Sequence, residues 1–242
     1  HPWDFIGSAA GNTIIQENGT LNGVGTVDLF GWVGESSEFT GAAEYGISSI
    51  SGSGYGISGV GHGNSASEHL KHDWGTTIGN GWRTPTKEEW TYVFNHPSSS
   101  IVNGTSDACY THATVAGIPG MILFPDGVTI ASNEIAWGDI NQNSAWATTC
   151  TADQWNAIFA PKNCVFLPAA GYRNGATVLN VPPSYAKNKI GGYYWSSSSS
   201  GKLSGDQLSQ AYSLYFKSGK LGTAAEDERR YGFTIRLVRD VE

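Results

Sequence analysis

The sequence predicts an α+β fold in which two short helices pack with several short strands around one core. Two helix-capping motifs predict the helices, and apolar runs bounded by glycine, serine or charged residues predict the strands. Most of the strands follow the helices, and the chain shows no internal repeat. This order favours α+β packing over a parallel sheet built from βαβ units.

The first third of the chain is rich in glycine and predicts loops with short strand-like pieces, such as residues 27–32. Residues 48–63, with the sequence SSISGSGYGISGVGHG, predict a long surface loop. A linker between two domains is the alternative for this stretch. Because Trp74 and Trp82 follow closely and need a core to bury them, we expect one continuous domain.

A capping box predicts the first helix. Thr86 and Glu89 have the spacing at which both side chains cap backbone N–H groups of the first turn, and Pro85 precedes them. We expect the helix to extend to about Asn95. Its apolar face at helical spacing comprises Trp90, Val93 and Phe94.

A second capping box, formed by Thr151 and Gln154, predicts the other helix. Pro161 is expected to end it, because proline disrupts a helix interior. Its apolar positions comprise Trp155, Ile158 and Phe159. Both helices are therefore expected to bury a tryptophan.

Apolar runs predict the strands. Residues 114–125 hold two such runs around Pro119 and Gly120, which predicts a hairpin with its turn at this pair. Further strands are predicted at residues 164–168, 192–196, 211–218 and 233–239. Within residues 211–218, strand alternation predicts that Tyr212, Leu214 and Phe216 point inward. The outward set is then Ser213, Tyr215 and Lys217.

Composition excludes several classes of partner. The 242 residues include nine tryptophans and are 39% hydrophobic, which is enough for a packed core. The net charge of −7 argues against nucleic acid and anionic membranes, because both need a basic surface. No apolar run approaches the roughly 18 residues of a membrane span, so we expect no direct membrane insertion.

The three cysteines, Cys109, Cys150 and Cys164, lack the CxxC spacing of a structural zinc site. One disulfide with a free thiol and three buried thiols are both open. Neither a nucleophile elbow nor a phosphate-binding loop is present, so the sequence predicts no catalytic residue, no cofactor and no enzyme activity. One cluster has a metal-like spacing, but we expect it to be a surface group without metal: Glu68, His69, His72 and Asp73.

Four ordered motifs connect the chain to a known family: GWRTPTKEEW (81–90), FLPAAGYR (166–173), GYYWSS (192–197) and GFTIRLVR (232–239). With these motifs the chain resembles the C-type-lectin-like proteins of gut Bacteroidetes and their phages. That family includes variable proteins targeted by diversity-generating retroelements and is similar in fold to formylglycine-generating enzymes. The resemblance covers roughly residues 25–240 and implies a C-type-lectin-like fold with two helices on small twisted antiparallel sheets, joined by long Gly/Ser-rich loops.

The resemblance also implies how the chain is divided. Since the chain begins with HPWDFIG, without Met or a signal segment, we expect it to be a piece of a longer chain. Residues 1–24 would be a lead-in segment and residues 25–242 the domain, with a variable region at about 194–236. The location implied is extracellular, at a cell surface or on a phage virion tail.

In the retroelement-targeted relatives the segment between the WSS and RLV motifs is diversified and binds the ligand. The resemblance therefore implies a binding domain whose partner is a protein or glycan ligand on a cell surface, either within a larger chain or as a homo-oligomer. A glycan-binding lectin and a structural domain of a surface lipoprotein or fimbrial assembly are the alternatives. The expected contacts are Ser198, Ser199, Ser200, Lys202, Asp206, Gln207, Gln210, Ser213, Tyr215, Lys217, Glu226, Asp227, Glu228, Arg230 and Tyr231.

Two departures from the relatives argue against catalysis and calcium. The formylglycine-generating relatives use a cysteine pair near the C-terminal end of the fold, and this chain has no cysteine after Cys164. The triplets with which calcium-dependent lectins hold their metal are also missing. The motif arginines are expected to be buried or half-buried structural groups: Arg173, Arg236 and Arg239.

Overall fold

The computed structural model describes Trp32, Asp73, Gly75 and residues 78–144, 146–174, 177–180, 189–200, 203–204, 207–208, 210–229 and 231–240. The lead-in segment at residues 1–24 and the glycine-rich stretch at 48–63 lie outside these residues. The described part is an α+β arrangement of short helices and small sheets, as predicted. None of its helices has the length and hydrophobicity that crossing a membrane requires.

The first capping box is confirmed and opens helix α3 (Lys87–Asn95). The Thr86 hydroxyl accepts a hydrogen bond from the Glu89 backbone N–H at 3.2 Å, and the Glu89 carboxylate accepts one from the Thr86 backbone N–H at 2.8 Å. Trp90 is buried as predicted, but Val93 is 36% exposed. The apolar face is narrower than predicted because the helix packs through the row that contains Trp90 and Phe94.

The second capping box opens α4 (Ala152–Gln154), which continues as the π-helix η2 (Trp155–Phe159) and the 3-10 helix η3 (Ala160–Lys162). Pro161 does not end this helix as predicted. It lies in the first turn of η3, where a proline needs no backbone N–H. The helix ends at Asn163, whose φ of 56° is left-handed.

The strands are short. They are β1 (Ile101–Val102), β2 (Thr105–Ser106), β3 (Tyr110–Val115), β4 (Ile118–Leu123), β5 (Thr129–Ile130), β6 (Thr148–Cys150), β7 (Val165–Pro168), β8 (Tyr172–Asn174), β9 (Thr177–Leu179), β10 (Gly191–Ser199), β11 (Leu203–Ser204), β12 (Gln207–Leu208), β13 (Gln210–Lys217) and β14 (Lys220–Glu228).

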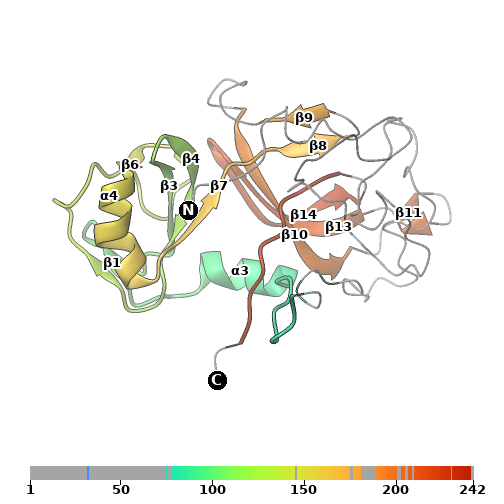
Figure 1. Ribbon diagram of the computed structural model, residues 1–242, viewed down its shortest axis with the longest axis horizontal. Helices are drawn as coiled ribbons and strands as arrows, with labels where there is room; N and C mark the ends of the chain where they lie inside the picture. Colours follow the sequence, from blue (N-terminus) through green and yellow to red (C-terminus); the bar gives the residue numbers. More distant parts are fainter. Residues whose placement is uncertain are drawn as a thin grey trace.

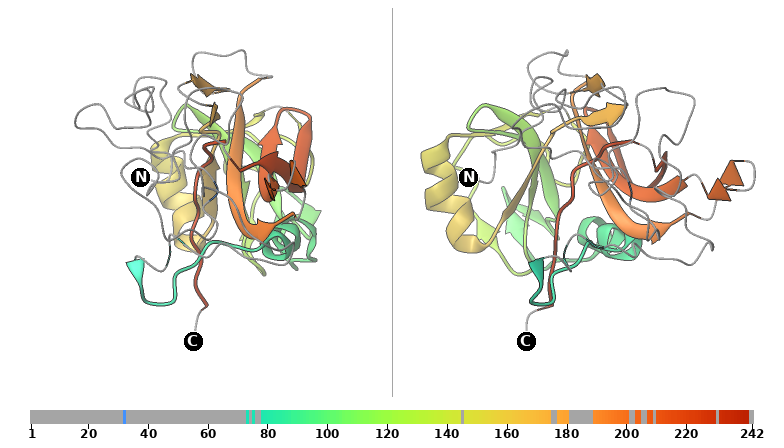
Figure 2. Two further views of the ribbon diagram at one scale, coloured as in Figure 1. Left: turned by 90° about the vertical axis from the view of Figure 1, so that its right-hand side faces the viewer. Right: turned by 45° about the vertical axis from the view of Figure 1, so that its right-hand side comes forward.

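Two larger sheets organise the described residues. One has the order β6-β3-β4-β7 and carries the α4 helix, and the other has the order β10-β13-β14 and packs against α3 (Figure 1). The views in Figure 2 show α3 beside the C-terminal strands and α4 on the far side of the other sheet. The first sheet is mixed, because β3 and β6 run parallel, whereas β10, β13 and β14 are antiparallel.

The predicted hairpin forms, but its turn is not at Pro119 and Gly120. The turn residues are Ala116 and Gly117, with φ of 50° and 85°, which suits a tight connection between β3 and β4. Pro119 and Gly120 lie inside β4. A Cβ at Gly120 would come within 2.5 Å of the Leu167 carbonyl oxygen on β7, so glycine is needed there for close strand approach.

The C-terminal segment differs most from the prediction. The sequence predicts no strand at residues 220–228, yet β14 pairs with β13 along its length. Residues 233–239 form no ladder: Thr234 bridges to Tyr194, and Val238 bridges to Arg83. After Thr234 the segment leaves β10 and runs to Arg83, which lies shortly before α3. Its backbone hydrogen bonds are therefore shared between β10 and the residues that precede α3.

A buried cluster joins the two sheets through α3. Trp90 contacts Tyr194 edge-on with ring centroids 6.2 Å apart, and its indole N–H donates to the Trp195 carbonyl oxygen at 3.3 Å. Leu214 and Phe216 enter the same cluster from β13, as predicted. The β10-β13-β14 sheet is therefore held on a rigid base.

Candidate functional site

Three of the predicted contact serines are not at the surface, and two of them lie on β10. Ser198 and Ser199 on β10 are buried. The Ser198 hydroxyl accepts a hydrogen bond from the Lys87 backbone N–H at 3.2 Å. The prediction that these serines are exposed contacts is wrong, because their hydroxyls are satisfied inside the protein and join β10 to neighbouring elements.

The buried Arg229 lies directly after β14 and anchors the end of the sheet. Its guanidinium lies 4.1 Å from the centre of the Trp32 ring, and its Nε–H donates to the Gln210 carbonyl oxygen at 3.0 Å. It also donates to the Ser199 hydroxyl. Trp32 in turn donates its indole N–H to the Ser196 carbonyl oxygen at 2.8 Å. The sequence shows no signal for this anchor, which links residues far apart along the chain.

Ser213 was predicted to point outward, and the structure corrects this. Its side chain is fully buried and its hydroxyl donates to Asp227 Oδ2 at 2.5 Å. Burial raises the pKa of the Asp227 carboxyl, and the bond from Ser213 opposes part of that rise. The parity was right, but the face that carries Ser213 also carries its buried cross-strand partner Trp195 and is not open to solvent there.

Tyr215 lies on this same face and belongs to a cluster of partly exposed tyrosines that we call the tyrosine patch: Tyr172, Tyr193, Tyr215 and Tyr231. Tyr193 and Tyr215 are cross-strand partners with nearly parallel rings 6.2 Å apart. Tyr172 contacts Tyr193 at 4.9 Å and Tyr231 at 5.6 Å. The four phenol rings of the patch thus come from strands β8, β10 and β13 and from the segment after β14.

Backbone geometry and hydrogen bonds position the patch. Gly222 is the partner of Tyr215 on β14, and a Cβ there would lie 2.4 Å from the tyrosine ring. The ring of Tyr215 therefore lies over the glycine backbone. The Tyr193 hydroxyl accepts a bond from the Asn180 side-chain amide at 3.0 Å, and burial raises the pKa of Tyr193 to about 12. Both ring positions are restrained.

The remaining predicted contacts are spread around the sheet. Lys202, Asp206 and Arg230 lie outside the described residues, and only the backbone of Gln207 is described, in β12. Partly exposed side chains belong to Ser200, Gln210, Lys217, Glu226, Asp227 and Glu228. The structure thus brings together four of the predicted contacts: Tyr215, Tyr231, Ser213 and Asp227. Glu226 lies on the opposite face of the sheet and lines a different surface.

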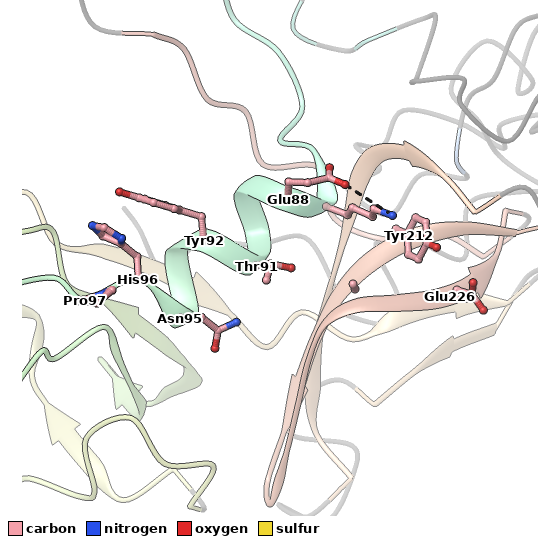
Figure 3. Close-up of a pocket in the computed structure, with 10 residues that line it drawn as sticks. Glu88, Thr91, Tyr92, Asn95, His96, Pro97, Tyr212 and Glu226 are labelled. Carbon is pink, nitrogen blue, oxygen red and sulfur yellow. Dashed lines mark ion pairs between the residues drawn. The ribbon is translucent and has the colours of Figure 1, made fainter.

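That second surface is an open groove of about 830 Å³ between α3 and the strands β13 and β14, here called the α3 groove (Figure 3). Two helix rows at a spacing of four line one wall: Lys87, Thr91 and Asn95, and beside them Glu88, Tyr92 and His96. Tyr212, Ala224 and Glu226 line the other wall. Tyr212 was predicted to be core, but it is only partly buried because it lies beyond the end of the apolar cluster.

The sequence predicts only the apolar face of α3 and gives no sign of a groove beside its polar rows. The groove exists because a second element lies beside the helix. That element includes strand β14, which the sequence does not predict. The motif arginines also differ from expectation. Arg173 is buried as predicted, and burial lowers its pKa to about 10, but Arg236 and Arg239 are exposed because residues 235–239 leave the sheet.

The structure describes all three cysteines but only part of the cluster with metal-like spacing. Within the described ranges no group of three His, Cys, Asp or Glu side chains is placed to hold a metal ion. Of the predicted histidine cluster only Asp73 is described, and it accepts a bond from the Thr84 backbone N–H at 2.8 Å. The cysteines are three buried free thiols, the second of the two alternatives. Burial raises the pKa of Cys150 to about 11 and of Cys164 to about 12.

A protein family matches part of the chain. It is described as Domain of unknown function (DUF8237), and it matches residues 127–238. The matched range contains all four residues of the tyrosine patch but not helix α3. No curated protein and no solved structure matches the chain.

Proposed function

We propose that the chain is a non-catalytic ligand-binding module and that the tyrosine patch is its recognition face. The observation that carries this proposal is the contact cluster of four partly exposed tyrosines beside the buried Trp195 and Phe233. Tyrosine supplies a large, amphipathic contact area and loses little conformational entropy when it binds. Partly exposed aromatic rings held in place are therefore well suited to bind a protein surface.

The scaffold beneath the patch supports this role. Trp195 and Ser213 lie next to Tyr193 and Tyr215 on the same face, and both are fully buried. Recognition residues act best when packed elements fix their positions. The part-buried Ser213–Asp227 hydrogen bond and the Arg229 anchor hold β13 and β14 together directly beside the patch.

The finer proposal rests on the four sequence motifs. We infer a C-type-lectin-like fold and a retroelement-diversified display domain at a cell surface or on a phage tail. Tyr215 and Tyr231 lie between the WSS and RLV motifs, where the resemblance implies diversification. A glycan ligand is the second candidate, favoured by the partial exposure of the four rings, since tyrosine rings also stack on the apolar faces of sugars.

Sequencing the genomic neighbourhood of the gene tests the diversification. We expect a near-copy of the DNA that encodes residues 190–240, beside a reverse transcriptase gene. The two copies should differ mainly at adenines, and the differences should include the codons of Tyr215 and Tyr231 while sparing those of Leu214 and Phe216, which are buried. Differences spread evenly over buried and exposed codons, or a single copy without a reverse transcriptase, would contradict a diversified face.

A further inference from the structure

The α3 groove contains a cation that the protein itself supplies. Lys87 places its ammonium 4.1 Å from the centre of the Tyr212 ring, and 3.6 Å from Glu88 Oε1 (Figure 3). An aromatic face together with a carboxylate is the arrangement that binds ammonium and guanidinium groups. Lys87 is the first residue of α3 and is partly exposed. Its long side chain can therefore turn out of the groove into solvent.

The opposite wall adds to the same chemistry. Glu226 is the direct cross-strand partner of Tyr212, so a second carboxylate lies beside the aromatic ring. The groove therefore combines two carboxylates with one ammonium, in a chain whose net charge is −7. A chain with this excess of acidic residues favours a positively charged partner over an anionic one.

Apolar surface also lines the groove farther along the helix. Tyr92 is 55% exposed, and its ring stacks on His96 with centroids 4.2 Å apart. Ala224 is exposed on the facing strand. The helix wall from Lys87 to Asn95 is about 12 Å long at 1.5 Å per residue, which suits several residues of a peptide rather than a single small ion.

We propose that the α3 groove binds a basic segment of a partner protein, with a lysine or arginine of that segment over Tyr212. In the unbound protein the ammonium of Lys87 occupies this position and acts as an internal competitor. Apolar side chains farther along the ligand contact Tyr92 and Ala224. Tyr212 and Tyr215 are an odd number of residues apart on β13, so this site lies on the opposite face from the tyrosine patch.

Fluorescence anisotropy with a labelled synthetic peptide of repeating Lys-Leu-Gly tests the proposal, with a Glu-Leu-Gly peptide as the control ligand. The wild-type domain should bind the lysine peptide and not the glutamate peptide, and salt should weaken the binding. Lys87→Met should bind the lysine peptide at least threefold more tightly than Lys220→Met. Lys220 is an exposed lysine and the first residue of β14, so its variant carries the same charge change outside the groove.

The aromatic ring is tested separately. Tyr212→Leu should weaken binding about tenfold or more, while Tyr212→Phe keeps the ring and should bind like the wild type. Thermal melting of each variant checks that it is folded. Three results would each overturn the proposal: no binding of the lysine peptide, a Lys87→Met variant no tighter than Lys220→Met, or a Tyr212→Leu variant that binds normally. If Tyr215→Ala rather than Tyr212→Leu abolished binding, the peptide site would be the tyrosine patch and the groove assignment would fail.

Discussion

Replacing Trp155 by alanine should destabilise the protein by about 3 to 5 kcal/mol. The indole is 2% exposed and lies at the start of the π-helix η2. Its ring stacks on Phe159 with centroids 5.3 Å apart and meets Phe166 edge-on at 5.9 Å. Because these rings fill the space between the helix and the β6-β3-β4-β7 sheet, alanine would leave a cavity that rigid neighbours cannot close.

Chemical denaturation measures this effect, with Asn156→Ala as the matched control. Asn156 is the next residue of the same helix and is exposed, so its replacement should change the free energy of unfolding by no more than about 0.5 kcal/mol. A Trp155→Ala protein with the denaturation midpoint of the wild type would show that η2 does not pack as described.

Lowering the pH from about 7 to about 4 should cost the protein up to roughly 3 kcal/mol of stability through His112 alone. His112 is 1% exposed on β3, its ring stacks on Trp146 at 5.0 Å, and Phe216 contacts it edge-on at 6.1 Å. Among the described residues neither ring nitrogen has a hydrogen-bond partner. Burial lowers the pKa of His112 from 6.5 to about 4, because the charged imidazolium would lack solvation.

The direction follows from the protons bound in each state. Between pH 6.5 and about 4 the unfolded chain holds a proton on this histidine and the folded protein does not, so stability is lost as the pH falls. His112→Leu removes the titration. We expect the difference in unfolding free energy between variant and wild type to shift in favour of the variant as the pH is lowered. At about pH 8, where the histidine is neutral in both states, the difference reports packing alone. A difference that stayed constant with pH would contradict the described burial of His112.

The helices of this fold are predictable from sequence because their signals are local. Thr86 with Glu89 and Thr151 with Gln154 satisfy their own first turns, and both boxes form as the spacing indicates. Strand β14 carries no comparable signal. Its sequence, KLGTAAEDE, has a low intrinsic preference for strand, and it forms one because β13 offers a paired edge.

The candidate site was predictable only in part, for the same reason. Alternation along β13 correctly separates Leu214 and Phe216 from Tyr215, but it cannot show that both faces of the sheet are covered near Ser213. Tyr172 and Tyr193 were missed as patch members because they occur inside motifs that look structural. Their role depends on Tyr231 reaching them from a distant part of the chain, a contact that depends on tertiary structure.

The most direct test of the recognition face compares two display libraries for the fraction of variants that resist protease. One randomises patch and adjoining surface positions, Tyr215, Lys217 and Tyr231, and the other randomises buried neighbours, Leu214, Phe216 and Phe233. A face built for variable recognition should tolerate most substitutions in the first library, since its scaffold is held by residues beneath it, and the second should lose nearly all folded variants. If the patch library lost its folded variants as completely as the core library, the tyrosines would be structural and the recognition face would lie elsewhere.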